Sequence, residues 1–275
     1  MGNLLEIMVL DGANGEGTFE WGQINYPDGQ VSISVGRQLY GRTVKIKARM
    51  RSFNDLQVIA CAVSACREAK CGDIELEIPY VLGGRSDRRF SQYGDHYLKD
   101  VICPFINSLK FSCVHILDPH SDVLPALLDR VHVLSADPFY FTVGQHIGKC
   151  TVVCPDAGAV RRATNYAAVN APCPVVYCSK KRDTATGKIL STTVSDPDII
   201  GGNDLVIVDD ICDGGATFLS LGRELRALKC RKLYLAVTHG IFSKGFLQLE
   251  EIFDHIFCTD SYKPVDNILV KQMKW

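Results

Sequence analysis

Short apolar runs that end in polar residues alternate with helix-like segments along most of the chain. The clearest runs occupy residues 112–118, 150–156, 204–210, 232–240 and 255–260. This alternation is typical of a parallel sheet whose strands are joined by crossover helices. Ligands of such sheets bind at the carboxyl ends of the strands, so the polar residues that end each run are candidates for a functional site. We therefore predict an α/β fold in which mainly parallel β-sheets are flanked by helices.

Two of the intervening segments have a helical pattern. Residues 54–70 carry apolar side chains at helical spacing after a polar start signal. Residues 218–229 place Leu221, Leu225 and Leu228 on one stripe. The chain has 275 residues, enough for two ordinary domains. We expect an N-terminal domain at about 1–141 and a C-terminal domain at about 142–275.

Composition narrows the classes of partner. The net charge is -1, which argues against nucleic acid or an anionic membrane as the main partner. No apolar stretch approaches the ~18–20 residues of a membrane span, and the start lacks a secretory signal. The twelve cysteines form no Cys-x-x-Cys pair, so zinc and redox spacings are missing. We expect a cytoplasmic protein with reduced thiols.

The most informative loop lies within residues 206–218, VIVDDICDGGATF. An apolar run delivers Asp209 and Asp210 to a strand end, and Gly214 and Gly215 then permit a tight turn into a helix. Consecutive backbone N–H groups at such a turn, next to a helix N-terminus, can hold an anion. Adjacent aspartates suit sugar hydroxyls or a metal-bound water. A phosphate cradle beside acids that can bind a diol predicts a ribose 5-phosphate site.

This stretch resembles the phosphoribosyl-binding motif of type I phosphoribosyltransferases and of ribose-phosphate diphosphokinases. The residues that match the ribose-phosphate site are Asp209, Asp210, Asp213, Gly214, Gly215, Ala216 and Thr217. Two of them depart from the motif, because Gly214 replaces a threonine and Ala216 stands where a glycine is common. The resemblance implies two phosphoribosyltransferase-like domains.

Residues 78–90, IPYVLGGRSDRRF, resemble the loop with which the diphosphokinases hold ATP. The resemblance assigns Arg85, Asp87 and Arg88 to ATP binding, which fits the ability of guanidinium groups to bind phosphate and stack on a base. His120 follows the run at 112–118 and matches the histidine that contacts the metal–ATP complex, where it would act as a metal ligand and catalytic residue.

Two later segments match the metal and lid parts of the same family. Asp156 corresponds to a Mg²⁺ ligand, and one carboxylate suffices because Mg²⁺ keeps waters and phosphate oxygens. Lys180 and Arg182 match the basic catalytic residues of a flexible arm. The small polar residues 183–188 that follow suit a mobile lid.

Residues 26–30 resemble the segment that reaches ATP from a neighbouring subunit in the family. The candidates are Tyr26, Asp28 and Gln30, and Gln30 replaces a glutamate. The resemblance implies a homo-oligomer, a dimer or larger.

The resemblance runs in order from about Tyr26 to Asp260 and favours a diphosphokinase. Such an enzyme uses Mg²⁺ and transfers the β,γ-diphosphoryl group of ATP to the C1 hydroxyl of ribose 5-phosphate, with release of AMP. An ADP-ribose acceptor, used in NAD reconstitution, is the second hypothesis. Gly214 motivates it, because the loss of a threonine removes a hydroxyl that can donate a hydrogen bond to a terminal phosphate, and it opens space for a larger acceptor. A non-catalytic regulatory homologue and a plain phosphoribosyltransferase are further alternatives.

Overall fold

The computed structural model describes residues 5–11, 15–182 and 189–275 and divides the chain into two compact units. Unit 1 comprises Met1–Leu134 and unit 2 Ser135–Trp275. The expected boundary after residue 141 falls inside helix α4 (Asp137–Ile147). The division lies earlier because Phe139 and Tyr140 of this helix belong to the hydrophobic core of unit 2.

Unit 1 is built from strands and helices in this order: β1 (Leu5–Asp11), β2 (Gly15–Thr18), β3 (Trp21–Asn25), β4 (Val31–Val35), β5 (Val44–Ala48), α1 (Phe53–Glu68), β6 (Ile74–Glu77), α2 (Cys103–Ser108), β7 (Cys113–Leu117), α3 (Val123–Leu127) and β8 (Val131–Leu134). Its main sheet has the order β2-β1-β5-β6-β7-β8. Strands β5 to β8 run parallel to one another, whereas β1 pairs antiparallel with both β5 and β2.

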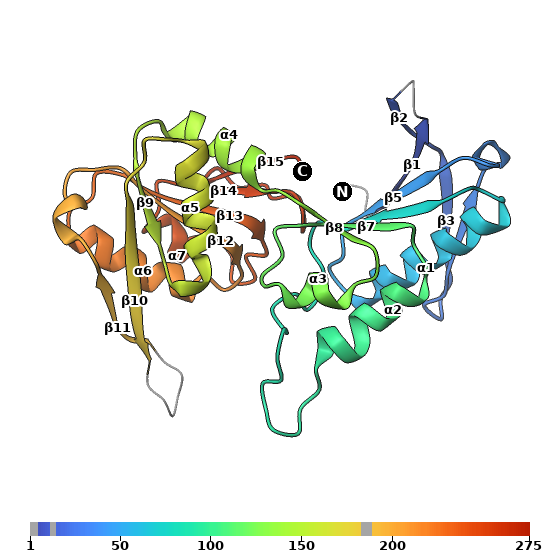
Figure 1. Ribbon diagram of the computed structural model, residues 1–275, viewed down its shortest axis with the longest axis horizontal. Coiled ribbons are helices and arrows are strands. Elements are labelled where there is room, and N and C mark those ends of the chain that lie inside the picture. Colours follow the sequence, from blue (N-terminus) through green and yellow to red (C-terminus); the bar gives the residue numbers. More distant parts are fainter. Residues whose placement is uncertain (1–4, 12–14, 183–188) are drawn as a thin grey trace. The chain divides into compact units, whose positions relative to one another are not determined.

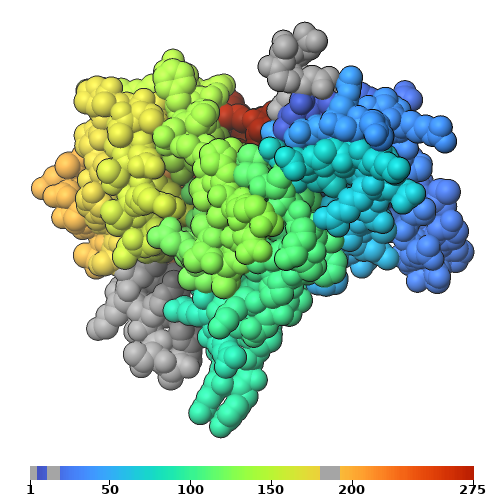
Figure 2. Space-filling view, turned by 45° about the vertical axis from the view of Figure 1, so that its right-hand side comes forward, coloured from blue at the N-terminus to red at the C-terminus, as the bar shows by residue number. Residues whose placement is uncertain are grey.

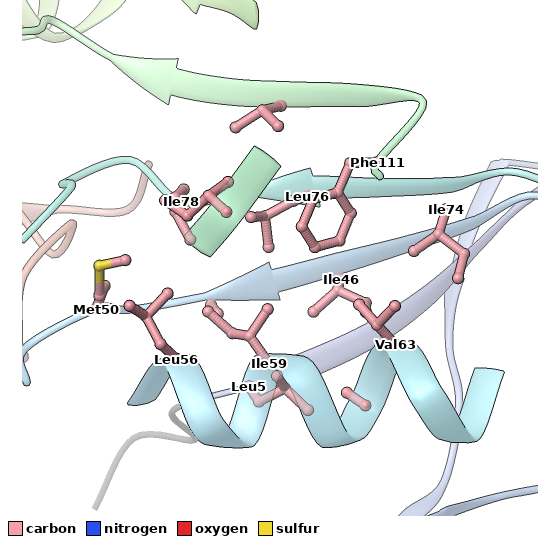
Figure 3. Packing of buried hydrophobic residues seen from close by; sticks show 14 of the residues in the cluster. Leu5, Ile46, Met50, Leu56, Ile59, Val63, Ile74, Leu76, Ile78 and Phe111 are labelled. Atoms are coloured by element: carbon pink, nitrogen blue, oxygen red, sulfur yellow. The ribbon is translucent and has the colours of Figure 1, made fainter. Parts of the chain in front are cut away.

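Helix α1 begins at Phe53, just before the range of residues 54–70 that the sequence predicted. Ser52 and Asp55 form a capping box, in which the Asp55 carboxylate accepts from the Ser52 N–H at 2.7 Å. The helix then packs Leu56, Ile59 and Val63 against the apolar face of the sheet (Figure 3). Alternate strand residues supply this face, since side chains of a strand point to opposite sides.

The opposite face of the same sheet is ionic. Glu77 of β6 lies between Lys45 and Lys47 of β5, at 3.4 and 3.3 Å. Glu75, also on β6, contacts Nε2 of His115 on β7 at 2.8 Å. Unit 1 therefore uses one face of its sheet for a hydrophobic core and the other for charge pairing between strands.

The two-stranded sheet of β3 and β4 packs on the outer side of α1. Val31, Ile33 and Val35, predicted to share one face, are partly buried against the core cluster. The Cys61 thiol of α1 donates to the Val31 carbonyl at 3.3 Å. Helix α1 is thus covered on two sides, which anchors the β3–β4 hairpin.

Unit 2 contains the following elements: α4 (Asp137–Ile147), β9 (Thr151–Cys154), α5 (Val160–Val169), β10 (Val175–Arg182), β11 (Ile189–Val194), β12 (Leu205–Cys212), α6 (Ala216–Ala227), β13 (Leu233–Gly240), α7 (Leu247–Glu250), β14 (His255–Thr259) and β15 (Val270–Met273). The sheet order is β11-β10-β9-β12-β13-β14-β15, and every pair except β10–β11 is parallel (Figure 1).

Both faces of the unit 2 sheet are buried under helices. Val206 and Val208 of β12 pack with α4 and α5, whereas Leu205 and Ile207 pack with α6 and α7. A strand buried on both faces reads as a continuous apolar run, which is how residues 205–208 appear in the sequence. The predicted α/β fold with mainly parallel sheets is confirmed.

In the described part of the chain, no helix combines the length and the apolar character needed to cross a membrane. The twelve cysteines all lie in that part and are free thiols. Most of them are buried, and burial raises the pKa of Cys66 and Cys103 to about 12, which keeps these thiols protonated.

The leucine stripe of α6 provides a test of the unit 2 core. Leu221 and Leu225 are fully buried, but Leu228 follows the last helical residue and is 36% exposed. Leu225→Ala is expected to lower the free energy of unfolding by about 2–5 kcal/mol because it leaves a cavity. Leu228→Ala is the matched control and should cost about 1 kcal/mol or less. Urea denaturation followed by circular dichroism measures both, and equal losses would contradict this packing.

Candidate functional site

The predicted ribose-phosphate residues lie where the strand order of unit 2 reverses. From β9 the chain moves outward to β10, then returns to the other side of β9 to form β12, and continues outward through β13. The gap between β9 and β12 is therefore a topological switch point, where α/β sheets form a ligand crevice at the strands' carboxyl ends. Asp156 follows β9, and Asp209 and Asp210 lie near the end of β12. The fold thus brings the predicted acids to the carboxyl ends of two neighbouring central strands, β9 and β12.

The two adjacent aspartates have different environments. Asp210 is buried and Asp209 half-buried, and the Asp210 N–H donates to Asp209 Oδ1 at 2.9 Å. Burial raises the pKa of the Asp209 carboxyl well above its usual value, and the charges of Asp210 and Asp156 raise it further. A cation or a set of hydroxyl donors bound at this edge would relieve that repulsion.

A buried arginine that the sequence did not single out supports the acid pair. Arg162 of α5 and Asp210 are each 4% exposed, and Arg162 Nη2 lies 3.7 Å from Asp210 Oδ2. Arg162 Nη1 also donates to the Gly158 carbonyl at 3.4 Å. Arg161, one residue earlier, is exposed. The helical spacing to the buried Tyr166, four residues later, is the signal that could have identified Arg162 as the inward-facing residue.

Asp156 is held by its own loop. Its Oδ1 accepts from the Gly158 N–H at 3.1 Å, which caps the turn that leads into α5. One carboxylate oxygen is therefore used to fix the loop. Asp156 also contributes to the raised pKa of Asp209, so the two carboxylates are close enough for their charges to interact.

The predicted phosphate loop connects β12 to the start of α6. Gly215 has φ 75° and lies directly before the helix, and a Cβ there would approach Leu249 Cδ2 to 3.2 Å, so this position requires glycine. Ala216 is exposed and Thr217 half-buried. The first N–H groups of a helix have no partner within the helix, so they are available to an anion. The loop places Asp213, Gly214 and Gly215 before them.

Unit 1 has a separate polar pocket. Its volume is about 760 Å³, and its lining residues include Arg85, Asp87, Arg88 and His120. Strands β6 and β7 continue to pair beyond their ends, since the Leu117 N–H donates to the Pro79 carbonyl at 3.0 Å. This pairing brings the loops after both strands together, so residues more than thirty positions apart line one pocket. Part of the lining is the loop between β6 and α2, which stands out from unit 1 (Figure 2).

The β3–β4 hairpin lies at a different place on unit 1. The Tyr26 N–H donates to the Gln30 carbonyl at 2.9 Å, and Asp28 Oδ1 accepts from the Gln30 N–H at 3.0 Å. Asp28 and Gln30 line a pocket of about 780 Å³ against α1, together with Phe53 and Gln57. The hairpin candidates and the Arg85–His120 pocket are thus not brought together within unit 1.

The predicted lid falls largely outside the described residues. Lys180 and Arg182 lie on β10, which pairs antiparallel with β11, but their side chains are not described. Residues 183–188, the remainder of the predicted lid, lie outside the description as a whole. Within the described ranges, no three His, Cys, Asp or Glu side chains are grouped to hold a metal ion.

The raised pKa of Asp209 predicts opposite effects of two neutral substitutions. A carboxyl whose pKa is higher in the folded state contributes stability at low pH that is lost as the pH rises through the folded pKa. Asp209→Asn removes that loss, so the variant should be more stable than wild type at about pH 7 and lose the advantage near the unfolded pKa, about pH 4.

Asp210→Asn is the contrasting variant. It leaves the buried Arg162 without its carboxylate, so it is expected to destabilise by about 3 kcal/mol. Thermal melting of both variants between these pH values measures the effects. If both substitutions changed the stability in the same direction, that would contradict the view that the charge of Asp209 destabilises the fold and the ion pair of Asp210 stabilises it.

Comparisons with known proteins agree with this geometry. The phosphoribosyl transferase domain model matches residues 139–266. Curated ribose-phosphate pyrophosphokinases of Vibrio parahaemolyticus and Vibrio cholerae are 26% and 25% identical to this chain, with 86% of this chain and 76% of each relative covered.

A solved structure extends the match to the fold. The phosphoribosylpyrophosphate synthetase of Mycobacterium smegmatis superimposes with a TM-score of 0.80 at 18% identity, covering 94% of this chain and 87% of that one. In sequence and in fold, this chain is thus a relative of the ribose-phosphate pyrophosphokinases and has the phosphoribosyltransferase fold.

Proposed function

We propose that the protein transfers the β,γ-diphosphoryl group of ATP to the C1 hydroxyl of ribose 5-phosphate and releases AMP. This proposal is based on the arrangement of residues at the carboxyl ends of β9 and β12, the switch point of the unit 2 sheet. There the adjacent carboxylates Asp209 and Asp210 lie near the end of β12, and a glycine turn then leads to the N-terminus of α6. The acids suit ribose hydroxyls, and the turn with its helix suits the 5′-phosphate.

The acceptor is held by groups of opposite character. The carboxylates accept hydrogen bonds from the ribose hydroxyls, and the backbone N–H groups of residues 213–217 donate to phosphate oxygens. The buried Arg162 pairs with Asp210 and holds it in place, so the site is organised before the sugar binds. The carboxyl of Asp209, whose pKa is raised by burial, is stabilised as an anion when hydroxyl donors arrive.

The nucleotide belongs to the pocket of unit 1 in this proposal. Arg85 and Arg88 provide guanidinium groups for phosphate oxygens, and His120 provides a ring nitrogen. The pocket of about 760 Å³ is in the size range of small-molecule sites. The hairpin residues Tyr26, Asp28 and Gln30 would act in the ATP site of a neighbouring subunit, which requires a homo-oligomer.

The donor groups near both sites fit a magnesium ion. Carboxylate oxygens are the protein ligands that Mg²⁺ prefers, and the loop bond from the Gly158 N–H to Oδ1 fixes the position of the Asp156 carboxylate. We propose Asp156 in unit 2 and His120 in unit 1, each considered within its own unit, as residues that would contact bound Mg²⁺. When bound with ATP, Mg²⁺ supplies charge neutralisation of the phosphate oxygens.

Release of AMP tests the proposed reaction. The purified protein is incubated with ATP, Mg²⁺ and either ribose 5-phosphate or ADP-ribose, and AMP is quantified by liquid chromatography. We expect AMP with ribose 5-phosphate, together with one equivalent of phosphoribosyl pyrophosphate. AMP with ADP-ribose alone would move the assignment to the second acceptor. ATP binding without AMP from any acceptor would favour a regulatory homologue.

The basic residues of β10 are proposed to neutralise charge on the transferred group. Lys180→Ala and Arg182→Ala are each expected to lower kcat by about 10²-fold, the effect of losing one preorganised charge donor. Lys149→Ala removes an exposed charge at the opposite, amino-terminal end of β9 and serves as the control. Steady-state kinetics with saturating ATP measures kcat, and an unchanged kcat in the first two variants would exclude both residues from the transfer step.

A further inference from the structure

A lysine from a different loop lies over the predicted phosphate loop. Lys244 occupies a turn between β13 and α7, closed by the Gly245 N–H, which donates to the Phe242 carbonyl at 3.1 Å. The Ile241 and Phe242 N–H groups both donate to the Cys212 carbonyl, at 2.9 and 3.1 Å. Because Cys212 is the last residue of β12, these bonds fix the turn beside the start of the phosphate loop.

The turn is also anchored by packing. The Phe242 side chain is 3% exposed, and its ring lies 4.8 Å from that of Phe246. Lys244 itself is exposed and forms no ion pair within the part of the chain that the structure describes. Its backbone is therefore held in place, whereas its ammonium group remains available to a ligand.

The stem of Lys244 occupies the space that Gly214 leaves. A Cβ on Gly214 would lie 3.4 Å from both Cδ and Cε of Lys244, and 3.7 Å from Cγ. These are van der Waals distances, so an alanine would just fit, and the two further atoms of a threonine would compete with the lysine stem. Gly214, unlike Gly215, does not have a positive φ, so its backbone accepts a side chain. The side chain that a larger residue at this position would meet first is that of the lysine.

Lys244 provides a positive charge next to a loop that is otherwise acidic. The end of β12 and the following loop carry Asp209, Asp210 and Asp213, which repel an approaching phosphate. Arg162 is buried against Asp210 and is not free to serve the ligand. At the position where related loops carry a threonine hydroxyl, this chain has a glycine with a lysine ammonium next to it, and an ammonium is the stronger donor to a phosphate dianion.

We propose that Lys244 is a specificity-determining residue that binds the phosphate monoester of the acceptor in place of the missing threonine hydroxyl. This inference rests on the proposed function, since it concerns the same loop. It also selects the acceptor class. A phosphate monoester carries close to two negative charges at neutral pH, whereas the sugar-linked phosphate of a diphosphate carries one. The space beside Gly214 is filled by the lysine stem, so it is not a channel for a second phosphoryl group.

Equilibrium binding tests the inference independently of turnover. Ribose 5-phosphate and ADP-ribose are titrated separately into the full-length protein without ATP, by isothermal calorimetry. Wild type is expected to bind ribose 5-phosphate more tightly, and Lys244→Ala to weaken that binding about tenfold, with a smaller loss for ADP-ribose. Lys244→Arg should retain most of the affinity. Lys232→Ala, which removes an exposed charge before the amino end of β13, should leave both affinities unchanged.

A double-mutant cycle tests the shared space. Gly214→Thr in the wild-type background should weaken ribose 5-phosphate binding, because the threonine displaces the lysine stem. In the Lys244→Ala background the same substitution should strengthen binding, because the hydroxyl then has room. A change of sign between the two backgrounds is not expected from a general loss of folding. Equal effects of Gly214→Thr in both backgrounds would refute the shared-space argument.

The remaining outcomes separate this inference from the proposed reaction. A dissociation constant of Lys244→Ala within about twofold of wild type would overturn the inference, as would wild-type preference for ADP-ribose. If the predicted binding pattern is found but no AMP is released, Lys244 keeps its role and the proposed reaction fails. If wild type binds neither acceptor, both fail.

Discussion

The buried ion pair between Arg162 and Asp210 is the interaction on which the acidic edge of unit 2 depends. Three aspartates meet where β9 and β12 end, and such a cluster would repel itself without a counter-charge. By strand alternation Asp210 shares the face of Val206 and Val208, which α5 covers, so it meets an arginine from that helix. The pair therefore links the helix after β9 to the end of β12, across the switch point. Asp209 points to the other side of the sheet. Its pKa is raised by burial and by the nearby charges of Asp210 and Asp156.

The sheets of the two units differ in how many of their faces are buried by apolar packing. Unit 2 buries both faces of its sheet, so its strands are rigidly held and its loops can be short and exact in their placement. Unit 1 buries one face and pairs charges on the other, and its polar pocket is formed by the long loop after β6 and the short loop after β7. A cradle for a small, highly charged sugar phosphate suits the first arrangement. The proposed nucleotide pocket, which residues of the long projecting loop help to line, belongs to the second.

Local patterns predicted the strands and helices well where a single physical signal dominated. The apolar spacing within residues 54–70 predicted α1, whose N-cap is Ser52, and the continuous apolar run before Asp209 marked β12. The pattern failed at Leu228, because the spacing of three leucines does not reveal that α6 ends at Ala227. The division between units falls after Leu134, a little before the expected boundary at residue 141, because the start of α4 contributes to the core of unit 2.

The sequence by itself determined the α/β class, the strand ends that carry polar residues and the resemblance of the loop from Asp213 to Thr217 to a phosphate cradle. These depend on periodicity and on short contiguous motifs. Only the tertiary structure decided that Arg162 rather than Arg161 supports the acids, and that Lys244 lies over Gly214. Both depend on contacts between segments distant in sequence, whose geometry is set by the packing of α5 and by the turn hydrogen-bonded to Cys212. Gly214 alone suggested an open space, and the fold shows that a lysine thirty residues later fills it.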